Sequence, residues 1–173
     1  MSVYDDHEAP MFSEDVLKLA ETALQTARDN HAMITTAESC TGGLVSAALT
    51  AIAGSSDVFD CGFSTYSYKA KSSLLGVPQS ILVEHGAVSE TVARLMAEGA
   101  LAHSVADVSV ALTGIAGPGG GLTDKPIGTV CFACARIGYK TRSLTHQFGN
   151  PGRPIVRMES VKVALGMLIE AFD

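Results

Sequence analysis

Residues 33–43, with the sequence MITTAESCTGG, join a β-compatible apolar start to an abrupt break into small polar residues and glycines. A helix-compatible run over residues 44–52 follows at once. A strand, a tight turn and a helix in this order lift a side chain out of a sheet, and they point the free N–H groups of a helix start at the same place. The stretch predicts an α/β domain that presents Ser39 to a ligand.

Helical and strand patterns alternate along the rest of the chain. Helices are expected over 14–30, 44–52, 68–75, 78–84, 90–103 and 154–172, and strands over 33–36, 58–66, 107–112, 128–135 and 139–147. The continuous apolar run 107–112 is typical of a central strand that is covered on both faces. The last two strands predict an antiparallel hairpin around Ile137 and Gly138. We therefore expect a three-layer α/β/α sandwich with a mixed, mostly parallel sheet that ends in this hairpin.

Length and composition narrow the class of protein. The 173 residues suffice for one domain with a full core, which we place at 13–173 behind a flexible, acidic arm at 1–12. A net charge of −6 without a basic block argues against nucleic acid or anionic lipid as the main partner. No long uncharged apolar run or leader peptide is present, so we expect a cytoplasmic protein. The 47% hydrophobic content makes a homo-oligomer plausible.

The cysteines do not form a recognisable metal or redox motif. Cys131 and Cys134 are spaced as CxxC, but they lie inside the β-like run TVCFACA, and Cys40 and Cys61 do not supply a second pair with zinc spacing. We favour buried free thiols over a redox or zinc role, and we expect no metal and no cofactor.

Ser39 has two interpretations that the spacing alone leaves open. Serine is a favoured helix N-cap, and the following glycines can be a simple tight turn. Alternatively, Ser39 is a nucleophile, with the N–H groups of Thr41, Gly42 and Gly43 as candidates for an oxyanion hole. The two interpretations are partly compatible, because a serine at a helix start lies where developing negative charge is stabilised.

A serine nucleophile needs a base. The histidines at 85, 103 and 146 lie at helix ends or in an exterior-looking strand without an evident aspartate partner. Lysine is the other option, provided that burial or a nearby cation lowers its pKa from about 10.4. Lys69 and Lys71 are two residues apart on an expected helix, so only one of them can face Ser39. The competing interpretation for either is a solvated surface lysine.

Two further segments are candidates for anion binding. Residues 113–126, TGIAGPGGGLTDKP, form a long glycine-rich loop that lacks the Walker pattern but can donate backbone N–H groups. Arg153 and Arg157 are four residues apart at the start of the last helix, so they share a face and could clamp a phosphate. Ordinary surface arginines are the alternative, although cations at a helix start oppose its dipole, which hints at a function.

Several motifs in order make the chain similar to one family. They are AESCTGG (37–43), AGSS (53–56), TYS…K (65–71), LLGVP (74–78), HGAVSE (85–90), TGIAGPGGG (113–121), KPIGTV (125–130) and GR…R (152–157). Through them the chain resembles the CinA C-terminal domain family over residues 13–172. The catalytic members of that family hydrolyse the carboxamide of nicotinamide mononucleotide to nicotinate mononucleotide and ammonia, a step of pyridine nucleotide salvage.

The resemblance implies a role for individual residues. Ser39 would be the nucleophile and Lys71 its general base, with Tyr66 alongside. The implied substrate-binding residues are Cys40, Thr41, Gly42, Gly43, Thr113, Gly114, Gly117, Gly119, Arg153 and Arg157. The implied partner is a pyridine nucleotide. A rival hypothesis is a non-catalytic nucleotide-binding or assembly module, which would bind ligand without releasing ammonia.

Overall fold

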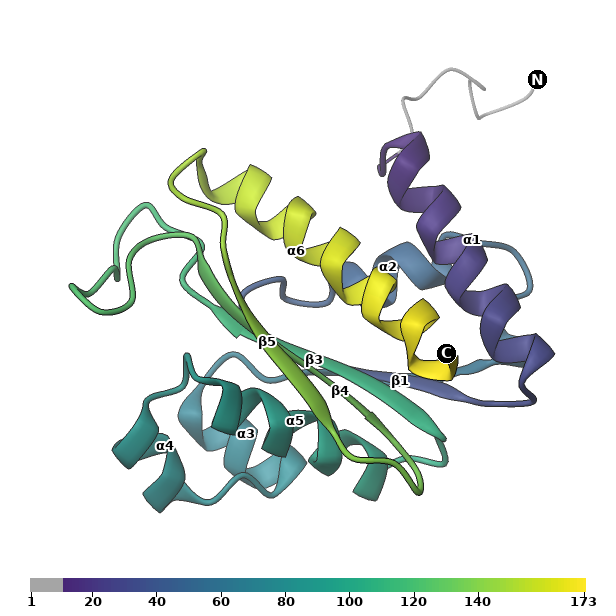
Figure 1. Ribbon diagram of the computed structural model, residues 1–173, viewed down its shortest axis with the longest axis horizontal. Helices are drawn as coiled ribbons and strands as arrows, with labels where there is room; N and C mark the ends of the chain where they lie inside the picture. The colour runs from purple at the N-terminus through teal and green to yellow at the C-terminus, as the bar shows by residue number, and fades with distance from the viewer. Residues whose placement is uncertain (1–10) are drawn as a thin grey trace, which may run out of the picture.

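The computed structural model describes residues 11–173 of the chain (Figure 1). Its helices are α1 (Glu14–Asp29), α2 (Leu44–Thr50), α3 (Tyr68–Leu75), α4 (Gln79–His85), α5 (Glu90–Ala102) and α6 (Arg153–Ile169), with 3-10 turns η1 (Ser55–Asp57) and η2 (Glu170–Phe172). Its strands are β1 (Ile34–Glu38), β2 (Phe59–Ser64), β3 (Val108–Gly114), β4 (Thr129–Arg136) and β5 (Arg142–Gln147). Within these residues no helix is both long and apolar enough to cross a membrane.

The strands form one mixed sheet in the order β2-β1-β3-β4-β5. β1 pairs in parallel with both β2 and β3, whereas β4 runs antiparallel to β3 and to β5. Helices α1, α2 and α6 cover one face of this sheet, and α3, α4 and α5 cover the other (Figure 1). The expected three-layer α/β/α sandwich with a terminal antiparallel hairpin is therefore confirmed.

Each face of the sheet has its own apolar core. The α1, α2 and α6 side packs around side chains such as Leu24, Leu49 and Leu165, while the α3 to α5 side packs around residues such as Leu75 and Met96. Strand β3 contributes to both cores, and its first six residues are buried. It is thus the doubly covered central strand that its apolar sequence predicts.

Two strands extend further toward the site than the sequence indicates. β1 continues through Glu38, which is paired with Leu112 of β3 and Ser64 of β2, so the polar break after Thr36 does not end the ladder. β3 likewise continues to Gly114, so Thr113 belongs to the strand and not to the glycine-rich loop. Strand β5, in contrast, is shorter than expected, because it begins at Arg142 instead of residue 139.

At the N-terminal end, residues 1–10 of the expected arm lie outside the described residues. Phe12, which we also assigned to that arm, is 2% exposed and packs into the core beneath α1. Within the described residues, packing into the core begins with Phe12, one residue before the Ser13 N-cap position of α1.

Helices α3 and α5 approach each other closely at Gly99. An added Cβ at Gly99 would lie 2.1 Å from the carbonyl oxygen of Leu75, the last residue of α3. We predict that Gly99→Ala lowers the free energy of unfolding by about 1–3 kcal/mol, because α3 must shift to relieve the overlap. Urea denaturation measures this change.

Gly166→Ala is the matched control for this prediction. Gly166 is also inside a helix, but an added Cβ there has no neighbouring heavy atom within 4 Å. Alanine should therefore stabilise α6 by up to about 1 kcal/mol through helix propensity. Equal stability of the two variants would contradict the close approach of α3 and α5.

Candidate active site

Ser39 lies in the turn that joins β1 to α2. Its N–H donates to the Leu112 carbonyl of β3 at 3.0 Å, which ties the start of the turn to the sheet. The chain then reverses through Gly42 (φ +63°) and Gly43 (φ +104°), left-handed conformations that glycine adopts without strain. Gly43, not Ser39, occupies the N-cap position of α2. The interpretation of Ser39 as a helix cap is therefore wrong, and its side chain is free for another partner.

That partner is Lys71. The Lys71 ammonium donates to Ser39 Oγ at 2.9 Å and to the Thr65 carbonyl at 2.7 Å. Lys71 lies in α3 and is only 1% exposed, whereas Lys69, two residues earlier, is exposed. Burial lowers the pKa of Lys71 from 10.5 to about 8. The structure thus brings Ser39 together with one of the two candidate lysines, and that lysine can be neutral near physiological pH.

The turn is built on a buried carboxylate that the sequence analysis missed. Glu38 is 1% exposed, and its Oε2 accepts from Thr41 Oγ1 at 2.6 Å, Gly43 N at 3.1 Å and Val45 N at 3.0 Å. Its Oε1 accepts from both the N–H and the hydroxyl of Ser46 at 2.9 Å. A buried charge is tolerated only when it is well hydrogen-bonded. Glu38 therefore fixes the turn and the first turn of α2 relative to β1.

A cavity of about 220 Å³ opens beside the Ser39–Lys71 pair. Its lining residues are Ser39, Cys40, Tyr66, Lys71, Ala87, Val88, Thr113, Gly114 and Arg153. They come from the ends of β1 and β3, the segment after β2, helix α3, the α4–α5 connection and the start of α6. The ends of β1 and β3 therefore converge on one site, which is typical of the sheet edge of an α/β domain.

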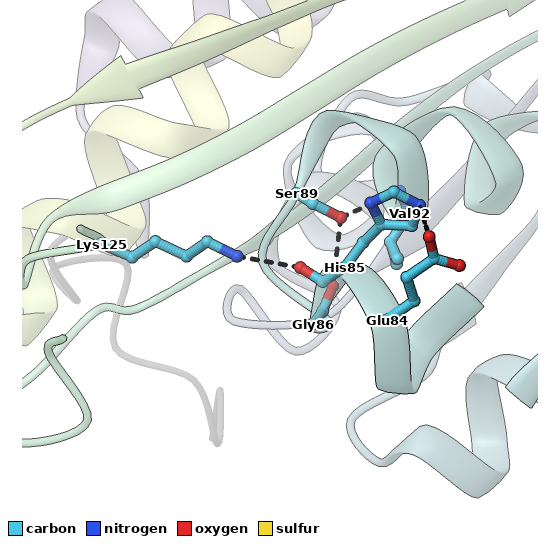
Figure 2. A network of polar contacts seen from close by, with 6 residues as sticks. All are labelled: Glu84, His85, Gly86, Ser89, Val92 and Lys125. Carbon is cyan, nitrogen blue, oxygen red and sulfur yellow. Dashed lines mark hydrogen bonds and ion pairs between the residues drawn. The ribbon is translucent and has the colours of Figure 1, made fainter. Parts of the chain in front are cut away.

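The α4–α5 connection forms a wall of this cavity, and the sequence analysis did not assign its residues to the site. Lys125, at the end of the glycine-rich loop, donates to the His85 carbonyl at 2.9 Å (Figure 2). Ser89 donates to the Gly86 carbonyl at 3.1 Å and caps α5 (Figure 2). From the sheet side, Thr113 Oγ1 donates to the Ala87 carbonyl at 2.9 Å. The HGAVSE motif was the signal that could have pointed to this wall.

Arg153 joins three segments at the mouth of the cavity. Its guanidinium donates to the Gly117 carbonyl at 2.8 Å and to the Tyr66 hydroxyl at 3.0 Å. Tyr66 is 65% exposed, so it stands at the entrance and not beside the buried amine. The structure therefore groups Tyr66 with Arg153, whereas the resemblance groups it with Ser39 and Lys71.

Six residues of the predicted binding set are outside the lining of the cavity. Thr41, Gly42, Gly43, Gly117, Gly119 and Arg157 do not line the cavity. The Gly42 N–H already donates to the Ser39 carbonyl at 3.1 Å, and the Gly43 N–H donates to Glu38. These two N–H groups are therefore not free for an oxyanion. Among residues 11–173 no backbone carbonyl accepts from the N–H groups of Cys40 and Thr41.

The thiol of Cys40 lies next to Ser39 in the cavity wall. Burial raises its pKa to about 11, so the thiol is protonated and is a poor competing nucleophile. All four cysteines are free, and Cys131 and Cys134 are buried, as expected. Over the described range, no three histidine, cysteine or acidic side chains lie together where they could hold a metal ion.

We predict that Glu38→Gln lowers the free energy of unfolding by about 2 kcal/mol or more, because an amide NH2 would face groups that are themselves donors. Glu98→Gln is the matched control: Glu98 is exposed and accepts a single bond from Thr141, so its effect should stay within about 0.5 kcal/mol. Chemical denaturation compares them. A Glu38 variant as stable as the Glu98 variant would show that the carboxylate does not hold the turn.

Comparison with known proteins identifies the family of this chain. The family model described as CinA C-terminal domain matches residues 16–172. A CinA-like protein from Mycobacterium sp. (strain JLS) is 48% identical over 98% of this chain, which covers 39% of that protein. A putative competence-damage inducible protein from Symbiobacterium thermophilum is 63% identical over 61% of this chain and 25% of its own length. The chain thus spans well under half the length of these curated relatives.

Solved structures agree over almost the whole fold. The competence/damage inducible protein CihA from Agrobacterium tumefaciens has a TM-score of 0.93 and 44% identity, covering 95% of this chain and 100% of that one. A CinA superfamily protein from Escherichia coli has a TM-score of 0.86 and 34% identity, covering 99% of both chains. By sequence and by fold, this chain belongs to the CinA C-terminal domain family.

Proposed function

We propose that this protein is a metal-independent amidohydrolase that converts nicotinamide mononucleotide to nicotinate mononucleotide and ammonia. The observation that carries the proposal is the buried hydrogen bond between Lys71 Nζ and Ser39 Oγ, together with the lowered pKa of Lys71. A serine hydroxyl next to an amine that is about half neutral at pH 8 is the arrangement needed for nucleophilic attack on an amide. The nucleotide substrate comes from the family resemblance.

The two hydrogen bonds of Lys71 orient its lone pair. A neutral amine has two N–H donors and one lone pair, and one N–H remains bonded to the Thr65 carbonyl. The lone pair can then accept the Ser39 hydroxyl proton across the 2.9 Å contact. Thr65 thus keeps the amine directed at the nucleophile without supplying a negative charge that would raise the pKa of Lys71.

The reaction follows from this arrangement. Ser39 Oγ attacks the carboxamide carbon as its proton passes to Lys71 Nζ, which gives a tetrahedral oxyanion. The N–H groups of Cys40 and Thr41 are the available donors for that oxyanion. The C–N bond then breaks as the Lys71 ammonium gives its proton to the amide nitrogen, which leaves as ammonia. Water, deprotonated by the same amine, hydrolyses the Ser39 ester and releases the carboxylic acid.

Charge and size at the site fit an anionic nucleotide that enters by its carboxamide end. At about 220 Å³ the cavity is smaller than the roughly 300–1,000 Å³ of most small-molecule pockets, so it suits the reacting end of a nucleotide. Arg153 stands at the mouth, where a phosphate would remain outside the cavity. In a protein of net charge −6, this local cation would favour the anionic substrate.

We predict that Ser39→Ala and Lys71→Met each lower ammonia release from nicotinamide mononucleotide by at least about 1,000-fold, because they remove the nucleophile and its base. Ser80→Ala and Lys69→Met are the matched controls, since both residues are exposed. A coupled ammonia assay measures turnover, and circular dichroism checks the fold. Near-normal turnover by the Ser39→Ala variant would contradict the proposal that Ser39 is the nucleophile. Ligand-induced thermal stabilisation of the unmodified chain without turnover would favour the binding-module hypothesis.

The pKa of Lys71 also predicts the pH dependence of the reaction. Only the neutral amine accepts the Ser39 proton, and the neutral fraction grows as the pH rises toward the lowered pKa of about 8. We therefore expect kcat/KM to rise about tenfold per pH unit below this value and to level off above it. Lys69→Met should leave the profile unchanged. A kcat/KM that keeps rising to about pH 10 would indicate an unperturbed lysine.

A further inference from the structure

Arg153 and Arg157 start from the same face of α6 but reach different targets. Arg153 lines the cavity, whereas the guanidinium of Arg157 donates through Nε to the Cys40 carbonyl at 3.2 Å and through one terminal nitrogen to the Thr41 carbonyl at 3.0 Å. These carbonyls belong to the two residues that follow Ser39. Arg157 therefore binds the backbone of the turn that carries Ser39 and joins β1 to α2.

The contact fixes two successive peptide planes. In a trans peptide the C=O and the following N–H point in opposite directions, so a carbonyl held toward Arg157 directs its N–H away from α6. The Cys40 carbonyl shares a peptide with the Thr41 N–H, from which no backbone carbonyl among residues 11–173 accepts. The Thr41 carbonyl shares a peptide with the Gly42 N–H, which donates back to the Ser39 carbonyl at 3.1 Å.

The same turn is held from its other side by Glu38. Its carboxylate binds the Thr41 hydroxyl at 2.6 Å and the Gly43 N–H at 3.1 Å, so Thr41 is contacted by both charged groups. A guanidinium is suited to binding the Cys40 and Thr41 carbonyls, because its planar group presents two N–H donors at a fixed separation. Arg157 is half-buried, and none of the ion pairs within the described residues involves it.

We infer that Arg157 is a positioning residue for the amidohydrolase reaction and not a ligand of the substrate phosphate. It holds the Cys40–Thr41 and Thr41–Gly42 peptides so that Ser39 Oγ stays on Lys71 and the Thr41 N–H stays available to the oxyanion. The inference rests on the proposed function for its catalytic consequence. The geometry of the turn that it invokes does not depend on that function.

The kinetic test compares Arg157→Ala, Arg157→Lys and Arg153→Ala with nicotinamide mononucleotide as substrate. We expect Arg157→Ala to lower kcat about 10- to 100-fold with KM changed less than about threefold, because a displaced turn affects the transition state. Arg157→Lys keeps the cation but loses the fork, so it should fall between the unmodified chain and Arg157→Ala. Arg153→Ala should instead mainly raise KM.

Arg94→Ala is the matched control for loss of a structural guanidinium. Arg94 joins α5 to the start of β5 by donating to Ser143 Oγ at 2.8 Å and to the Thr141 carbonyl at 3.3 Å, away from the cavity. It should lower stability without a comparable loss of kcat. An Arg157→Ala variant that raises KM as Arg153→Ala does, or that retains the original kcat, would overturn the inference.

A second readout needs no turnover. Hydrogen exchange of the peptide over residues 39–45, followed by mass spectrometry, should speed up at least about tenfold in Arg157→Ala and stay unchanged in Arg153→Ala and Arg94→Ala. Unchanged exchange in Arg157→Ala would refute the turn-holding role. If the unmodified chain released no ammonia, the proposed function would fail, and this exchange experiment would still decide whether Arg157 holds the turn.

Discussion

A lysine ammonium that is removed from water needs either a negative partner or a way to lose its proton. Lys162, which stays partly exposed, illustrates the effect of negative partners: it lies 2.7 Å from Asp15 and 2.9 Å from Glu159, and these partners raise its pKa. Lys71 instead contacts only a hydroxyl and a carbonyl oxygen, and burial lowers its pKa to about 8. Because no carboxylate contacts Lys71 within the described residues, no such partner offsets this lowering of its pKa.

The layered architecture brings Ser39 and Lys71 together, because separate elements meet at one edge of the sheet. β1 delivers Ser39, and α3, on one face of the sheet, supplies Lys71 (Figure 1). From the opposite face, α6 supplies Arg157 to the turn and Arg153 to the cavity mouth. Each layer thus contributes one part of the site, so the packing of α3 on α5 and of α6 on the sheet sets the geometry.

Local sequence signals predicted most of the elements. Helix α3 has the bounds expected from the sequence, 68–75, and the structure shows why: Ser67 accepts from the Ala70 N–H at its start, and Gly76 adopts φ +68° at its end. Spacing could not reveal the roles of Glu38 and Arg157. The partners of Glu38 are backbone and hydroxyl groups that gather only when the turn folds. Arg157 shares a helix face with Arg153, but four residues advance it about 6 Å along the axis, to the turn instead of the cavity.

The central claim is that the amine beside Ser39 is partly neutral near physiological pH, because burial without a counter-charge lowers its pKa to about 8. Its most direct test is an NMR titration of the Lys71 side chain, with selectively labelled lysine, assignment by Lys71→Met, and exposed Lys69 as the internal reference. The account predicts that Lys71 titrates near 8. A Lys71 midpoint that coincides with that of Lys69, near the ordinary value of about 10.4, would contradict it.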